Sequence, residues 1–334
     1  MAGAYLSLIS VRRFSVGKTR LTISEQVRLL KERGLKVADF EECGRFLQMT
    51  NYYRFSGYFR YWQSDPLHGS NIFIPGADFD TIRGVYEAEQ EFSSECSRAL
   101  HQIEIILRAN FAYYCSFNVS GCGLVQREGF SAPRESSSSS LDHLIVRDLN
   151  LSKEAFIEHY RAGSAFSGDD EFTAENYTNL PSWVVVEALS FGTLSRCIEA
   201  SELSGDISEI ARSLGVAKKT IVSQVRSFVY LRNRCAHNLR LWNHSVLNPP
   251  KVNNNISNRA KRKYGTFGDR SVFRILVCLE TVLSSSGVAK GWLDRRIMPL
   301  LGANPELKRG ILTPHKYGDY TPSCGLTLRA TASP

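Results

Sequence analysis

The residues best suited to chemistry lie in one stretch, 230–243, which reads Tyr-Leu-Arg-Asn-Arg-Cys-Ala-His-Asn-Leu-Arg-Leu-Trp-Asn. Its histidine, His237, can take and give a proton near neutral pH. Its arginines can bind phosphate oxygens through their guanidinium forks. Attack of a ribose 2′-hydroxyl on the adjacent phosphate requires proton transfer and charge neutralisation together. The stretch therefore predicts a site that grips and cleaves a phosphodiester.

The sequence around this stretch is basic. From residue 210 to residue 268 there is no Asp or Glu, and Lys or Arg stands at 212, 218, 219, 226, 232, 234, 240, 251, 259, 261, 262 and 263. The formal net charge is +8, and residues 251–310 alone carry 12 Lys and Arg against 4 Asp and Glu, so the remainder is close to neutral. Positive charge confined to one region predicts a polyanionic partner.

A helix over 217–243 would arrange these residues on two faces, at about 100° per residue. The apolar stripe would carry Ile221, Val225, Phe228, Cys235, Leu239 and Trp242. The opposite face would carry Arg226, Tyr230, Asn233, His237 and Arg240. His237 is the first catalytic candidate, although a histidine on a polar face is more often merely solvated. Asn233, one turn earlier, would orient the imidazole or bind the phosphate, and Arg240 would bind a phosphate oxygen.

Arg232 does not share the polar face. The same winding places it on the apolar stripe, about 140° from His237. A buried arginine needs a carboxylate, and Glu104 and Glu187 are the two acids in the most apolar surroundings. Two interpretations of Arg232 therefore stay open: a catalytic residue or one half of a core ion pair.

Apolar periodicity predicts an all-α bundle, with a small helical N-terminal unit at 21–78, a main bundle at 79–286, an N-terminal arm at 1–20 and a basic C-terminal extension at 287–334. Helices are predicted at 24–33, 39–49, 79–117, 141–162, 182–201, 206–214, 217–243 and 270–286. Gly34 should end the first helix, and glycines and serines at 121–140 and 168–170 predict flexible loops. Aromatic residues at 51–62 would either pack in a core or stack on bases, and the core is the commoner role.

Composition excludes several classes of protein. The eight cysteines form no CxxC pair and no zinc-finger spacing, which predicts reduced thiols, no metal and no cofactor. The first 19 residues lack the order of a secretory signal, and no apolar run approaches the ~20 residues that a membrane helix needs. A cytoplasmic protein without a membrane partner is expected.

Arg232-Asn233-x3-His237 resembles the R-N-x-x-x-H motif of HEPN domains, all-α bundles of which many are metal-independent endoribonucleases. Four further stretches, 21–30, 51–58, 103–108 and 189–195, resemble the Abi family of abortive-infection proteins, of the AbiD/AbiF type. The resemblance covers roughly residues 21–245 in order. It implies a HEPN-like bundle and an antiphage, toxin-like endoribonuclease with catalytic Arg232, Asn233 and His237. Its products would be a 2′,3′-cyclic phosphate and a 5′-hydroxyl.

The resemblance also implies partners. Members pair two such motifs, but here Arg309-x5-His315 is the only other match, and Gly310 and Pro314 should interrupt its helix, so a homodimer is expected. The expected RNA-binding residues are Arg226, Tyr230, Arg234, Arg240, Lys261, Arg262 and Lys263, supported by Glu104, Arg108 and Glu187. A structured small RNA would suit the basic segment 251–263, for which a solvated loop is the simpler alternative.

Two other functions stay open at this point. The first is a HEPN protein that binds a structured RNA without cleaving it, and the second is a protein-interaction bundle whose charge only keeps it soluble. Metal-free cleavage that disappears in His237→Ala would separate the nuclease from the first. Absence of RNA affinity and of a steep salt dependence would mark the second.

Overall fold

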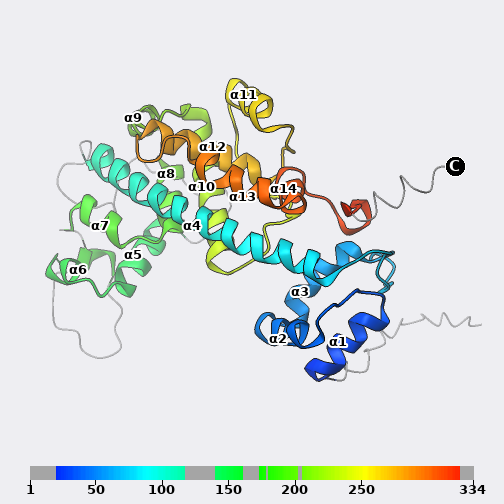
Figure 1. The fold of residues 1–334 in the computed structure, drawn as a ribbon. Coiled ribbons are helices and arrows are strands. Elements are labelled where there is room, and N and C mark those ends of the chain that lie inside the picture. Colours follow the sequence, from blue (N-terminus) through cyan, green and yellow to red (C-terminus); the bar gives the residue numbers. More distant parts are fainter. Residues whose placement is uncertain (1–19, 117–139, 161–172, 178–179, 202–204, 324–334) are drawn as a thin grey trace, which may run out of the picture. The chain divides into compact units, whose positions relative to one another are not determined.

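The structure is a computed structural model that describes residues 20–116, 140–160, 173–177, 180–201 and 205–323. Within these ranges the chain is helical and forms no β-strand, apart from two isolated bridges, Lys36 with Asp78 and Gln63 with Phe73 (Figure 1). The all-α prediction is confirmed. None of the described helices combines the length and apolar character needed to cross a membrane. The predicted loop at 168–170 lies outside the described residues, as do the predicted loop at 121–140 apart from Ser140, which caps α5, and the predicted arm at 1–20 apart from its last residue.

The chain divides into two compact units, residues 1–82 with 321–334, and residues 83–320. The first contains α1 (Ile23–Glu32), α2 (Phe40–Thr50), α3 (Tyr52–Phe59), the 3-10 helix η1 (Arg60–Trp62) and the first residues of α4 (Phe79–Ser116). The second contains the rest of α4 and the elements α5 (Leu141–Leu151), α6 (Ala155–Tyr160), η3 (Ala174–Tyr177), α7 (Ser182–Ala188), α8 (Phe191–Ala200), α9 (Asp206–Ser213), α10 (Lys218–Ala236), α11 (Asn254–Tyr264), α12 (Val272–Ser285), the π-helix η4 (Leu293–Ile297), α13 (Met298–Ala303), α14 (Pro305–Leu312) and η5 (Tyr317–Asp319).

Local signals explain the helices of the first unit. Thr22 and Glu25 form a capping box that begins α1, and Gly34, at φ +94°, follows its end as predicted. Most aromatic side chains of the stretch 51–62 are buried: Phe55, Tyr58, Phe59, Tyr61 and Trp62. Phe55 packs edge-to-face on Phe46, with ring centroids 5.0 Å apart. The core interpretation is therefore confirmed for this stretch, apart from exposed residues such as Tyr53.

In the second unit, α10 packs against α8 and α12 (Figure 1). The predicted core residues of α12 are buried: Val272, Ile275, Leu276, Leu279 and Val282. All six described cysteines are free and buried. Two predicted helices are divided, 141–162 between α5 and α6, and 182–201 between α7 and α8. Ser190 makes the second break, because its hydroxyl caps α8 at the Thr193 N–H, 3.2 Å away.

Residues 287–320 pack into the same unit and bury Leu301, Leu307 and Ile311. Helix α14 runs through Gly310, so the expected interruption at this glycine is wrong. The reason is a close approach. A Cβ on residue 310 would lie 2.5 Å from Cδ1 and Nε1 of Trp242, so only glycine fits between the helix and this ring.

Candidate functional site

Helix α10 ends at Ala236, seven residues before the predicted end at 243. The Leu239 N–H donates to the Arg234 carbonyl at 2.8 Å, and the Asn238 N–H donates to the Cys235 carbonyl at 3.0 Å. Asn238 adopts the left-handed conformation, with φ +50°. These bonds form a Schellman ending, for which Asn is the usual substitute for Gly. His237 is therefore the C-cap of α10, and the prediction that it lies inside a continuous helix is wrong.

The chain after His237 reaches the core without a helix. Leu239 is 47% exposed, so its predicted place on the buried stripe is wrong, whereas Trp242 is fully buried. The carboxylate of Glu89 on α4 accepts the backbone N–H groups of Leu241 and Trp242, the latter at 3.2 Å. One buried carboxylate therefore binds the segment that follows the candidate catalytic residues.

Arg232 lies in a cluster that joins α10 to α4. Its Nε is 3.8 Å from Glu104 Oε2, and its Nη1 donates to Asn233 Oδ1 at 3.0 Å. Glu104 Oε1 also pairs with Arg108 Nη2 at 2.5 Å, and Arg108 Nη1 donates to the Val186 carbonyl at 2.5 Å. Glu104 is thus the carboxylate that Arg232 requires, and the Arg232 side chain remains 35% exposed.

Glu187, the other predicted carboxylate, is exposed instead of embedded in the core. Helix α7 buries Val185 and Val186, which turns residue 187 toward solvent. Asn233 and His237 are also exposed, and the imidazole of His237 has no hydrogen-bond partner within the described part of the chain. The site thus combines a tethered guanidinium with a free imidazole.

Two of the predicted RNA-binding cations are paired with carboxylates. Arg226 pairs with Glu199 of α8, through Nε to Oε2 at 3.1 Å and through Nη2 to Oε1. Lys263 pairs with Asp294 of η4 at 2.5 Å. Residues 210–268, the acid-free segment, contain no Asp or Glu. Elements outside this segment thus supply the carboxylates that pair with its cations. Lys261 lies 5.6 Å from the Phe267 ring centroid, and Arg262 is exposed.

A second polar cluster forms around His244, a residue that sequence reasoning missed. Its Nε2 is hydrogen-bonded to the Tyr230 hydroxyl, and Arg234 donates to the Arg240 carbonyl beside it. Burial, aided by the charges of Arg234 and Arg240, lowers the pKa of His244 to about 4. His244 is therefore neutral at pH 7. The helical winding could not find it, because His244 lies one residue beyond the predicted helix 217–243.

The sequence of residues 45–243 matches the family described as Abi-like protein. The chain belongs to the Abi-like protein family. Membership indicates an abortive-infection protein. The matched range of this Abi-like protein includes Arg232, His237 and Tyr230 and ends one residue before His244. No curated protein and no solved structure is detectably similar to it.

Proposed function

We propose that this Abi-like protein is a cytoplasmic, toxin-like HEPN endoribonuclease of the AbiD/AbiF type, which cleaves RNA without a metal ion in an antiphage, abortive-infection response. The observation that supports it most is the end of α10. There Arg232, oriented by Glu104 and Asn233, precedes an exposed imidazole at the C-cap. Phosphate binding and proton transfer are the two functions that RNA transesterification needs.

Each residue has a role in this reaction. Arg232 and the amide N–H₂ of Asn233 bind the scissile phosphate, since Asn233 Oδ1 is occupied by Arg232. His237 takes the proton of the 2′-hydroxyl. The bond between the 2′-oxygen and phosphorus forms, the bond between phosphorus and the 5′-oxygen breaks, and the 5′-oxygen takes up a proton from water.

A homodimer completes the proposed site. One chain offers a single motif. Arg309 and His315 do not match it, because His315 lies three residues beyond the end of α14, whereas His237 directly follows the last residue of α10. Two chains would present two copies of His237 to one RNA. A structured small RNA would bind the basic residues of α11, Lys261, Arg262 and Lys263, as a controlling partner.

Cleavage of total RNA in EDTA by wild type and His237→Ala tests the nuclease. Wild-type cuts ending in cyclic phosphate, lost in His237→Ala, are the expected result. His143→Ala, which removes an exposed histidine of α5, is the matched control and should cut as wild type does. Wild-type activity in His237→Ala, or a requirement for added metal, would contradict the proposal.

A non-cleaving RNA-binding protein is the second candidate function. It is favoured by the imidazole of His237, which no other described residue orients for proton transfer. In this case wild type and His237→Ala bind RNA with equal affinity and a steep salt dependence, and neither protein cleaves it. A bundle that serves only protein interaction would show no RNA affinity at all.

A further inference from the structure

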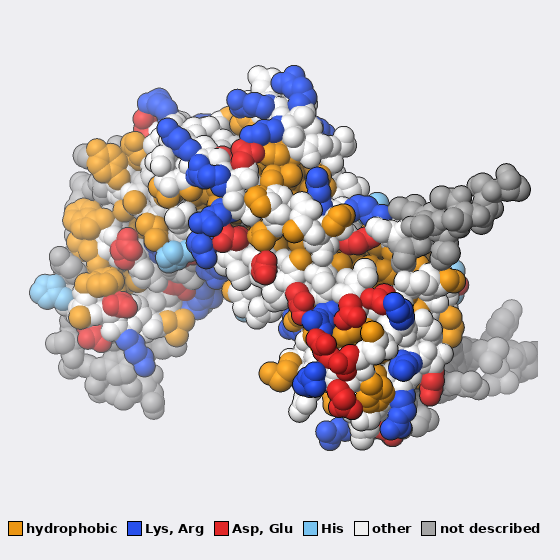
Figure 2. All heavy atoms as spheres, in the orientation of Figure 1, with side chains coloured by type: hydrophobic (Ala, Val, Ile, Leu, Met, Phe, Trp, Pro, Cys, Tyr) orange, Lys and Arg blue, Asp and Glu red, His pale blue; other side chains and the backbone are white. Residues whose placement is uncertain are grey.

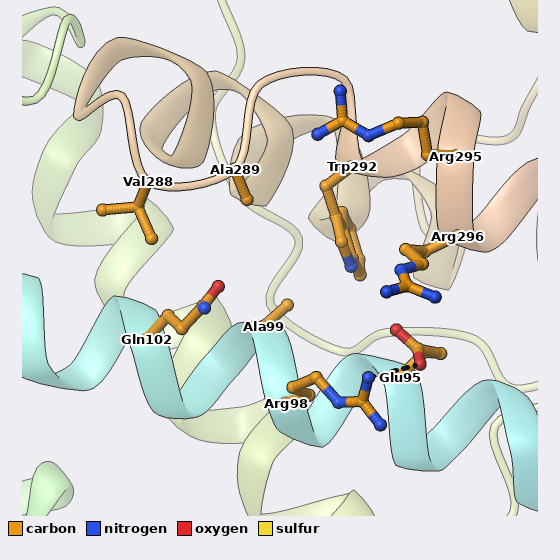
Figure 3. Close-up of a pocket in the computed structure, with 9 residues that line it drawn as sticks. All are labelled: Glu95, Arg98, Ala99, Gln102, Val288, Ala289, Trp292, Arg295 and Arg296. Carbon is orange, nitrogen blue, oxygen red and sulfur yellow. Dashed lines mark ion pairs between the residues drawn. The ribbon is translucent and has the colours of Figure 1, made fainter.

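A pocket of about 220 Å³ lies between α4 and the segment from residue 288 to residue 296. Its lining includes Glu95, Arg98 and Gln102 of α4, Trp292 at the N-cap of η4, and Arg295 and Arg296 within η4 (Figure 3). All of them belong to the second compact unit. None of these residues belongs to the motif at 230–243.

The wall formed by η4 is held in a fixed position. Glu280 of α12 accepts the Gly291 N–H on Oε1 at 3.0 Å and the Leu293 N–H on Oε2 at 2.8 Å. Ser284 donates to the same carboxylate at 2.6 Å. These bonds fix the position of Trp292 and of the turn of π-helix that follows it. The π-helix is rare in proteins and is frequent at functional sites. The pocket is therefore preorganised on one side by α12.

The lining carries excess positive charge. Arg98 pairs with Glu95 at 3.2 Å, which balances one cation. Arg295 and Arg296 are exposed and form no ion pair with any residue that the structure describes. Figure 2 shows Lys and Arg side chains in a row that crosses α4 and the segment between α12 and α13. Unpaired guanidinium groups at a pocket favour phosphate, which they bind through two N–H groups at once.

The floor of the pocket favours a planar ligand with N–H donors. Figure 3 shows the Glu95 carboxylate between the guanidinium groups of Arg98 and Arg296, with the Trp292 indole above it. Glu95 Oε2 is buried and accepts no hydrogen bond from the described residues. A buried carboxylate oxygen that accepts no hydrogen bond is destabilising. A ligand N–H group that donates to this oxygen would remove the desolvation penalty and so favour binding. The amide of Gln102 is a further group for recognition.

We propose that this pocket binds a nucleotide whose base carries an amino group, with the phosphate on Arg295 and Arg296 and the base between Trp292 and Glu95. Adenine, guanine and cytosine carry such a group, whereas uracil offers a carboxylate only its single N3–H. Trp292 supplies an aromatic surface of the kind on which bases stack. The site uses none of the residues at the end of α10, so it does not depend on the proposed nuclease.

Calorimetric titration of the full chain with AMP, GMP, CMP, UMP, guanosine and inorganic phosphate tests the proposal. AMP, GMP and CMP should bind at least about tenfold more tightly than guanosine or inorganic phosphate. UMP should bind on the order of threefold to tenfold less tightly than AMP, GMP and CMP. The double variant Arg295→Ala/Arg296→Ala should weaken nucleotide binding about tenfold or more. Lys251→Ala/Arg259→Ala, which removes the same charge from the acid-free segment, is the matched control and should bind as wild type does.

Glu95→Gln separates recognition of the base from attraction to charge. It should weaken binding of the amino-bearing nucleotides while inorganic phosphate binds no more weakly than to wild type. Equal losses in both double variants would overturn the proposal, because they would reveal a diffuse charge effect. Binding of long RNA without binding of any mononucleotide would also overturn it. His237→Ala should leave nucleotide binding unchanged, so failure of the nuclease and failure of this site are distinguishable.

Discussion

Arg232 Nε lies 3.8 Å from Glu104 Oε2, which joins the last turns of α10 to the middle of α4. The same carboxylate binds Arg108, so a single acid holds two guanidinium groups. Arg232 can therefore be positioned and still keep a third of its side chain in solvent.

Removing this carboxylate should cost stability. Glu104→Ala leaves Arg108 and Arg232 without a counter-charge, and we expect the free energy of unfolding to fall by about 1–3 kcal/mol. The loss should be smaller than for a fully buried pair, because solvent screens the exposed part of Arg232. Urea denaturation followed by circular dichroism measures it. Glu187→Ala, at an exposed acid of α7, should change the free energy by less than about 0.5 kcal/mol, and an equal loss would disprove the assignment.

The left-handed backbone at Asn238 should govern the end of α10. Asn238→Ala should lower the free energy of unfolding by about 1 kcal/mol, because Ala is strained at φ +50°. Asn238→Gly, which adopts this conformation freely, should lie closer to wild type. Thermal melts of the two variants measure the difference. Equal melting temperatures would show that the turn does not constrain the helix end.

The contact between Gly310 and Trp242 predicts a position-specific penalty. A Cβ at residue 310 would lie 2.5 Å from the Trp242 ring and 2.9 Å from Asn243 Oδ1, so Gly310→Ala should lower the free energy of unfolding by about 1–3 kcal/mol. Gly302→Ala is the control, because no atom lies within 4 Å of its added Cβ in α13. It should stabilise by about 0.5–1 kcal/mol. Denaturant titration measures the free energy of unfolding of both variants. Equal changes in Gly310→Ala and Gly302→Ala would refute the contact.

His244 should make stability depend on pH. Burial and the nearby arginines lower its pKa from 6.5 to about 4, so the unfolded chain binds its proton first as the pH falls. Its contribution is present above pH 6.5 and is lost as the pH falls toward 4. The difference in unfolding free energy between wild type and His244→Gln should therefore shrink across this window. Urea midpoints from pH 4 to pH 8 measure it, with His143→Gln as the exposed control that should keep the wild-type slope.

Much of the helical architecture could be predicted from local patterns. Apolar spacing predicted 79–117 and 270–286, and the structure has Phe79–Ser116 and Val272–Ser285. Helix α11 was missed because few apolar residues mark a core-facing stripe there. Helix α14 was missed because Gly310 was expected to interrupt it. The end of α10 was missed for a different reason. Its signal is one residue, Asn238, whose left-handed conformation outweighs an apolar period that continues to Trp242.

The candidate site likewise has features that the sequence predicted and features that depended on packing between helices. The winding of α10 showed that Arg232 would need a carboxylate, but the choice of Glu104 over Glu187 depended on which helix packs against it. An acid-free segment predicted a cationic surface. Whether those cations are free was decided by Glu199 and Asp294, which come from other elements.

The sequence by itself determined the helical class, the family and the set of residues that could perform chemistry at 230–243. These features depend on residues that lie close together along the chain. Such residues can be recognised from their spacing of three or four positions in the sequence. Tertiary structure alone decided the partner of Arg232, the burial of His244 and the pocket between Glu95 and Trp292. Each of these joins segments far apart in the sequence, and only packing of the whole core brings such segments within a few ångströms.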